Sequence, residues 1–246
     1  MARIAVILPA AGKSTRFRDK DKKVFATIDG RAVWLRAAEA FVSRQDVVQS
    51  LVVIAPEDDD DFRRRYGAHL GLLGIEIVPG GAERFESVGN ALARIRDDVD
   101  LVAIHDAARP CVSSAHIDAV FATAAKTGAA LLAVPVSDTV KRSDDRGKVE
   151  ATVPRKNLWL AQTPQVFRRD WLADAHARRG QLGRDITDDA QLVEAAGHPV
   201  HLVTGSASNL KITTREDLAL AEAILRARPA PKTPRPSHPF DDEVKW

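Results

Sequence analysis

The sequence predicts an α/β fold in which helices cover both faces of a mostly parallel β-sheet. Short, continuously apolar runs, typical of strands buried on both faces, recur along the 246-residue chain. Longer segments with apolar residues at helical spacing separate these runs, as in βαβ units. One polar, β-prone segment interrupts the alternation. The pattern is Rossmann-like, with a β-arm that projects from the sheet.

Each element follows from its own residue pattern. Apolar runs predict strands at residues 4–8, 51–55, 101–104, 130–136 and 200–203, with a weaker strand at 76–78. Helical spacing of apolar residues predicts helices at 32–42, 88–95, 117–127 and 218–226. Ligands of such sheets bind at the carboxyl ends of the strands, so residues just after each apolar run are candidates for the site.

Two segments depart from this rhythm. Residues 137–154 are polar and charged with β-prone stretches, which predicts a projecting hairpin. Residues 227–246 contain five prolines and mixed charge, which predicts a flexible tail. We therefore expect a single domain over residues 1–226, with its arm at about 137–154 and the tail after it.

Composition excludes several classes of protein. The net charge is only +2, from 36 basic and 34 acidic residues, which disfavours a general nucleic-acid binder. The single cysteine, Cys111, excludes an intramolecular disulfide framework and is expected to be a buried apolar filler. No apolar stretch approaches the roughly 20 residues of a membrane helix. The first apolar run is too short for a signal peptide, so a cytoplasmic location without membrane partners is expected.

The loop after the first strand is a candidate phosphate site. Residues 9–12 are small, so their backbone amides can approach an anion closely. The loop is not a P-loop, because Ile7 stands five positions before Gly12, where that motif needs glycine. It is not a dinucleotide fingerprint either, because Ser14 and Phe17 occupy glycine positions. Taken alone, these residues fit a tight structural turn equally well.

Two further segments follow predicted strands. Gly80 and Gly81 allow an unusual turn before a helix that begins near Arg84 and Ser87, where a base or phosphate can bind; ordinary helix capping is the alternative. Asp106 follows the strand at 101–104 and is suited to a divalent cation that bridges phosphates. A local ion pair with a neighbouring arginine is the alternative interpretation there.

As an ordered set, these motifs resemble the 2-C-methyl-D-erythritol 4-phosphate cytidylyltransferases of the nucleotidyltransferase superfamily. The resemblance covers about residues 4–226, and two positions depart from it: Ser14 replaces a second glycine and Lys22 replaces a proline. Its motifs are residues 9–12 with Arg16 and Lys23, then 80–87, 105–110, 135–142, Arg155 with 158–159, 162–167, 187–188, 209–213 and 216–218.

The resemblance implies an enzyme of the non-mevalonate route to isoprenoids. It would transfer CMP from CTP to 2-C-methyl-D-erythritol 4-phosphate, release pyrophosphate and form 4-diphosphocytidyl-2-C-methyl-D-erythritol. It would be a homodimer in which the arm at 137–154 reaches the partner's site, and it would use Mg²⁺ or a similar cation. No nucleic acid takes part.

The resemblance also implies a role for each candidate residue. The catalytic residues would be Arg16, Lys23, Arg155 and Lys211. The CTP-binding residues would be Pro9, Ala10, Ala11, Gly12, Gly81, Arg84, Ser87, Asp106 and Ala107. The acceptor would be held by Arg109, Thr139, Arg155, Thr187 and Lys211, and the metal by Asp106.

Three other functions remain open at this point. A ribitol-5-phosphate cytidylyltransferase shares much of the pattern and differs in the acceptor. Another sugar-phosphate nucleotidyltransferase would use UTP, GTP or ATP. A nucleotide-binding regulator without catalysis belongs to another class, and the presence of all four cationic positions disfavours it.

Overall fold

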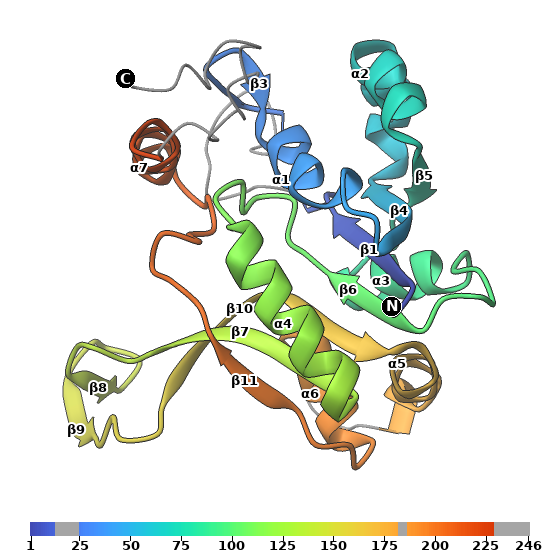
Figure 1. The fold of residues 1–246 in the computed structure, drawn as a ribbon. Coiled ribbons are helices and arrows are strands. Elements are labelled where there is room, and N and C mark those ends of the chain that lie inside the picture. The colour runs from blue at the N-terminus through green and yellow to red at the C-terminus, as the bar shows by residue number, and fades with distance from the viewer. Residues whose placement is uncertain (13–24, 182–185, 229–246) are drawn as a thin grey trace, which may run out of the picture.

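The computed structural model describes residues 1–12, 25–181 and 186–228 of the chain. Its central sheet consists of β1 (Ile4–Pro9), β4 (Val47–Ile54), β5 (Ile75–Pro79), β6 (Leu101–Ile104), β7 (Ala129–Pro135), β10 (Trp159–Arg168) and β11 (His201–Thr204). The strand order is β11-β7-β10-β6-β1-β4-β5 (Figure 1). Every neighbouring pair is parallel except the two that β10 makes with β6 and β7. The predicted mostly parallel α/β fold is confirmed.

Helices cover both faces of this sheet (Figure 1). The α-helices are α1 (Val33–Val42), α2 (Asp59–Leu73), α3 (Arg84–Leu92), α4 (Ser114–Thr127), α5 (Arg169–Ala177), α6 (Asp189–Ala195) and α7 (Arg215–Arg226). Short 3₁₀ turns, η1 (Pro56–Asp58) and η2 (Arg179–Gln181), and a small ribbon of β2 (Thr27–Ile28) and β3 (Arg31–Ala32) complete the body. Among the described residues, no helix is both long and apolar enough to cross a bilayer.

Alternation along the strands divides the core into two layers. In β1, Val6 and Leu8 face one layer, where α1, α2 and α4 pack, and Ile7 faces the other, where α3, α5 and α6 pack. Successive side chains of a strand point to opposite faces, so an unbroken apolar run is what a sheet covered on both sides requires. Cys111 is buried in a third cluster against α7, as the sequence predicts for an apolar filler.

The predicted hairpin is present. It consists of β8 (Val140–Ser143) and β9 (Val149–Val153), which pair antiparallel. Most of its side chains are exposed, and it projects from the body at the lower left of Figure 1. In the part of the chain that the structure describes, this arm therefore has no core of its own.

Several elements of the structure have no clear pattern in the sequence. β10 contains Pro164 and two glutamines, so its apolar pattern is broken, and its pairing with β7 shifts register between Ala161 and Gln165. α2 buries only Phe62 and Leu70 over 15 residues, which leaves little helical periodicity to detect. The predicted tail, residues 227–246, lies outside the described residues from position 229 onward.

Candidate active site

A cavity of about 640 Å³ lies at the carboxyl ends of β1, β4, β5 and β6. The segments that follow these four strands form its walls, and the segment between β11 and α7 contributes Lys211. Its lining residues are Pro9–Gly12, Ala55–Glu57, Gly80–Arg84, Ser87, Asp106, Ala108 and Lys211. This is the edge of the sheet at which ligands of open α/β folds bind.

The turn after β5 needs glycine at both positions of its pair. A Cβ atom at Gly80 would lie 2.6 Å from Cβ of Ala11, and one at Gly81 would lie 2.4 Å from Cβ of Glu86. The backbone nitrogen of Gly81 donates a hydrogen bond to Oγ of Ser87 at 3.1 Å, and Ser87 in turn donates to the carbonyl of Glu83. Gly80 thus allows the turn to approach the β1 loop closely, Gly81 allows it to approach Glu86 of α3, and Ser87 holds the turn on the first part of α3.

The carboxylate of Asp106 lies among three cationic side chains at the cavity. Nζ of Lys211 lies 2.9 Å from its Oδ2, and Nε of Arg109 lies 3.5 Å from the same oxygen. On the other side, Nη2 of Arg84 lies 3.9 Å from Oδ1. Burial by itself would raise the pKa of the Asp106 carboxyl, but the charges of Lys211, Arg84 and Arg109 outweigh burial and lower its pKa well below the ordinary value. One ionised carboxylate therefore faces three cations, of which Arg84 is also paired with the buried Asp189 at 2.6 Å.

Lys211 is held on both sides along the chain. Nδ2 of Asn209, which is buried, donates to the carbonyl of Thr163 on β10 at 2.9 Å. The backbone nitrogen of Ile212 donates to the carbonyl of Ala108 at 2.9 Å. These two anchors fix the segment beside the end of β6, so the ammonium of Lys211 meets Asp106 although the two residues lie far apart in the sequence.

His105 helps to fix the backbone of Asp106 through the hydroxyl of Thr163. Its Nε2 lies 3.0 Å from the carbonyl of Arg109, and its Nδ1 lies 3.2 Å from Oγ1 of Thr163. The same hydroxyl accepts a hydrogen bond from the backbone nitrogen of Asp106 at 3.0 Å. A neutral ring with its proton on Nε2 satisfies all three contacts, because Thr163 can then donate to Nδ1. Burial lowers the pKa of His105 to about 4.

We expect this histidine to make stability depend on pH. Its pKa is lower in the folded protein than the unfolded value of about 6.5, so the unfolded state binds more protons between those values. The free energy of unfolding should therefore fall by about 3 kcal/mol as the pH drops from about 6.5 to 4. Urea denaturation across that range measures the change. His105→Gln should flatten this part of the profile, and an equally steep profile in the variant would contradict the assignment.

Many of the predicted site residues meet at the cavity. Pro9, Ala10, Ala11, Gly12, Gly81, Arg84, Ser87, Asp106 and Lys211 line it together. The side chain of Ala107 is fully buried in the core, and Ala108 lines the cavity instead. Arg109 lies behind Asp106, where its Nη1 donates to the carbonyl of Asn209 at 2.6 Å. Arg16 and Lys23 lie outside the described residues.

Three other predicted residues do not line this cavity. Thr139 and Arg155 belong to the projecting arm and its base, where Arg155 donates to the carbonyl of Ser137. Thr187 is exposed before α6, and its backbone nitrogen donates to Oε1 of Gln191. A role for Thr139 or Arg155 in the reaction would need the arm of a second copy of the chain.

Some supporting residues were not singled out from the sequence. Thr163 and Asn209 lie within motifs that carry the family resemblance, but nothing in the sequence says that they position Asp106 and Lys211. Asp189 is fully buried beside Arg84, but no sequence pattern predicted that it would be buried or close to the site. Their contacts join segments far apart in the chain, which single-sequence patterns do not reveal.

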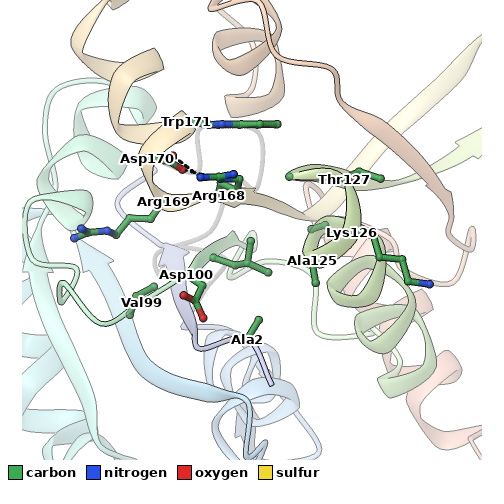
Figure 2. A pocket seen from close by; sticks show the side chains of 13 residues that line it. Ala2, Val99, Asp100, Ala125, Lys126, Thr127, Arg168, Arg169, Asp170 and Trp171 are labelled. Atoms are coloured by element: carbon green, nitrogen blue, oxygen red, sulfur yellow. Dashed lines mark hydrogen bonds and ion pairs between the residues drawn. The ribbon is translucent and has the colours of Figure 1, made fainter.

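A second cavity, of about 540 Å³, lies at the opposite edge of the sheet, around the start of β6 and the end of β10 (Figure 2). Arg168 lies there, paired with Asp170 at 2.8 Å and 5.4 Å above the ring of Trp171. Lys126 and Asp100 are also in its lining. None of the predicted site residues that the structure describes lines it, so the first cavity is the candidate site.

Known proteins are similar in sequence to this chain along most of its length. Residues 4–227 match the family model described as 2-C-methyl-D-erythritol 4-phosphate cytidylyltransferase. A protein of that name from Rhodopirellula baltica is 48% identical over 235 residues, covering 91% of this chain and 95% of the relative. One from Pelotomaculum thermopropionicum is 44% identical, covering 93% and 96%.

Solved structures agree as well. The crystal structure of 2-C-methyl-D-erythritol 4-phosphate cytidylyltransferase from Thermus thermophilus is 36% identical, with a TM-score of 0.72, and the match covers 92% of this chain and all of that one. The 4-diphosphocytidyl-2C-methyl-D-erythritol synthase from Anaerococcus prevotii is 29% identical, with a TM-score of 0.77, covering 92% and 99%. The chain therefore belongs to the 2-C-methyl-D-erythritol 4-phosphate cytidylyltransferase family.

Proposed function

We propose that the cavity around Asp106 is the site at which this cytidylyltransferase transfers CMP from CTP to 2-C-methyl-D-erythritol 4-phosphate. The products are pyrophosphate and 4-diphosphocytidyl-2-C-methyl-D-erythritol. One observation carries the proposal: Lys211, Arg84 and Arg109 converge on the buried carboxylate of Asp106 beside a loop of small residues. Cations held at such a place can pair with the phosphates of two polyanions.

The walls of the cavity suit a nucleotide. Small side chains at Ala10, Ala11 and Gly12, opposite the glycine turn, leave backbone close to the cavity. Arg84 lies at the first position of α3, where its guanidinium faces both the cavity and Asp106. In this proposal, the loop and the turn enclose the CTP, and Lys211 lies where the acceptor phosphate approaches it.

The reaction is an in-line displacement. An oxygen of the acceptor phosphate attacks the α-phosphorus of CTP, a new P–O–P bond forms, and the bond between the α-phosphorus and the bridging oxygen breaks to release pyrophosphate. A phosphate monoester is already anionic near neutral pH, so no general base is needed. The residues act by orienting the reactants and neutralising charge, which are the terms that dominate such reactions. We assign Lys211 this role here, and assign it to Arg16 and Lys23 by the family resemblance.

Asp106 is the residue of this cavity that would hold a divalent cation. Among the described residues, no group of three or more His, Cys, Asp or Glu side chains is arranged to hold a metal. Mg²⁺, however, usually binds through one or two carboxylates, with phosphate oxygens and water completing its shell. Asp106 is the ionised carboxylate at the centre of this cavity and would hold it. When bound, the ion neutralises charge on the triphosphate and its leaving group.

We infer that the chain forms a homodimer through its arm. Most residues of β8 and β9 are exposed, and two apolar residues, Val149 in β9 and Leu160 near the start of β10, are 55% and 58% exposed. Arg155 and Thr139 do not line the cavity of their own chain. We propose that each arm inserts beside the partner's cavity, so that Arg155 and Thr139 hold the acceptor there. This would bury the exposed apolar surface and complete the set of cations.

A pyrophosphate-release assay tests the function. With CTP, Mg²⁺ and 2-C-methyl-D-erythritol 4-phosphate, we expect steady release of pyrophosphate and formation of the diphosphocytidyl product. Ribitol 5-phosphate with CTP, and UTP, GTP or ATP with the same acceptor, should give much slower release. Faster release with ribitol 5-phosphate would replace the acceptor in this proposal. No release with any pair would favour a non-catalytic nucleotide binder.

A further inference from the structure

The carboxylate of Asp189 is fully buried although it lies at the first position of a helix, α6. Its Oδ2 accepts a hydrogen bond from Nη1 of Arg84 at 2.6 Å. Its Oδ1 faces Nε2 of His176 on α5 across 3.6 Å, which is too long for a direct hydrogen bond. An isolated buried carboxylate is costly, so this one persists because of the charge beside it. The carboxylate of Asp189 has no part in the proposed transfer of CMP.

Arg84 lies between two carboxylates. Nη1 binds Asp189, and Nη2 faces Asp106 at 3.9 Å on the cavity side. The much shorter contact is the one with Asp189, so this ion pair decides where the guanidinium lies. Without it, the side chain would keep only the longer contact and would gain rotamers that point away from the cavity.

Asp189 is itself fixed to the strand beside Asp106. Gln165 on β10 is buried, and its Oε1 accepts from the backbone nitrogen of Ala190 while its Nε2 donates to Asp188. Gln165 pairs across the sheet with Ile104, the last residue of β6. The start of α6 is therefore fixed to β10, and β10 pairs with β6, whose last residue, Ile104, shortly precedes Asp106. Arg84 bridges two carboxylates whose separation the sheet sets.

The geometry points to Asp189 as a positioning residue for nucleotide binding: it holds the guanidinium of Arg84 at the wall of the cavity, ready for the phosphates or ribose of CTP. This inference rests on the proposed function, because it takes CTP to be the occupant of the cavity. Asp189 does not touch the nucleotide. It acts only through Arg84.

Steady-state kinetics with Asp189→Asn test the inference. The substitution keeps the shape of the side chain and removes its charge. We expect the KM for CTP to rise by ~10-fold, with kcat and the KM for the acceptor within about twofold of wild type, because a ground-state binding contact is weakened. Calorimetric titration of CTP with Mg²⁺ should show the same loss of affinity. A residue that only stabilised the fold would lower the active fraction and leave the KM for CTP unchanged.

A double-mutant cycle with Arg84 separates the explanations further. Arg84→Ala should raise the KM for CTP, and Asp189→Asn should add almost nothing in the Arg84→Ala background, since both act through one contact. The double variant also removes the unpaired buried charge that could prevent Arg84→Ala from folding. Full additivity would overturn the inference.

A matched control comes from the other edge of the sheet. Asp46→Asn breaks an Arg–Asp pair of 2.8 Å, with Arg44, just before β4 and far from the cavity. It should lower stability without changing the KM for CTP. A normal KM for CTP in folded Asp189→Asn would overturn the inference while leaving the proposed function intact. A wild-type protein without cytidylyl transfer would refute the proposed function, and CTP titration would then still report whether Asp189 affects binding.

Discussion

Replacing Lys211 by alanine is expected to lower kcat/KM by roughly 10²- to 10³-fold. The ammonium lies 2.9 Å from Asp106 at the wall of the cavity, and two fixed anchors hold its segment in place. Because these anchors place the ammonium before the substrates bind, its charge can stabilise the transition state with little reorganisation. Initial rates of pyrophosphate release at several CTP and acceptor concentrations measure the effect.

Lys126→Ala is the matched control. Lys126 lines the second cavity, at the other edge of the sheet, and its removal deletes the same charge without touching the site (Figure 2). The control should retain wild-type kinetics. Lys211→Arg should recover only part of the activity, since a planar guanidinium does not replace a compact ammonium at a tight contact. Turnover of Lys211→Ala within about threefold of wild type, in a folded protein, would remove Lys211 from the mechanism.

Replacing Arg155 by alanine should cost a similar factor, ~10²-fold in kcat/KM, although Arg155 lines no part of its own chain's cavity. In the proposed dimer, its guanidinium pairs with the acceptor phosphate in the partner's site, so the KM for the acceptor should rise most. The KM for CTP should change little. Lys148→Ala, a cation in the turn of the same arm, is the control and should keep wild-type rates. Normal kinetics of Arg155→Ala would show that the arm does not supply this charge.

The sheet could be predicted from sequence because its strands are buried on both faces. The run at residues 4–8 is apolar throughout, and the strand 101–104 agrees with β6 at both ends. β10 was missed since its partners impose its extended form despite a proline and polar residues. α2 is supported by Arg–Asp pairs at helical spacing, such as Arg63 with Asp59, and by the packing of only two buried side chains. Its apolar residues therefore show little helical periodicity, and the sequence did not predict it. Such tertiary and surface effects leave little trace in the apolar pattern.

Some residues of the candidate site could likewise be predicted from the sequence, and others could not. Asp106 and the glycine pair were found because they directly follow strands, and a parallel sheet brings such positions together. Lys211 was assigned through the family resemblance, since the contacts that bring it to Asp106 join distant segments. Asp189 was not found, because a buried carboxylate can be told from a surface one only when its partner, Arg84, is placed beside it.

The central claim is that cations from two copies of the chain meet at one cavity. Subunit mixing tests this claim most directly. Lys211→Ala and Arg155→Ala proteins, each nearly inactive, are co-expressed with different tags, and the mixed dimers are isolated by both tags. In a symmetric dimer with arms exchanged, a mixed dimer has one site with both defects and one with neither, so about half of the wild-type activity per dimer should return. If the isolated mixed dimers stay as inactive as their parents, Arg155 does not act across the subunit boundary and the account is wrong.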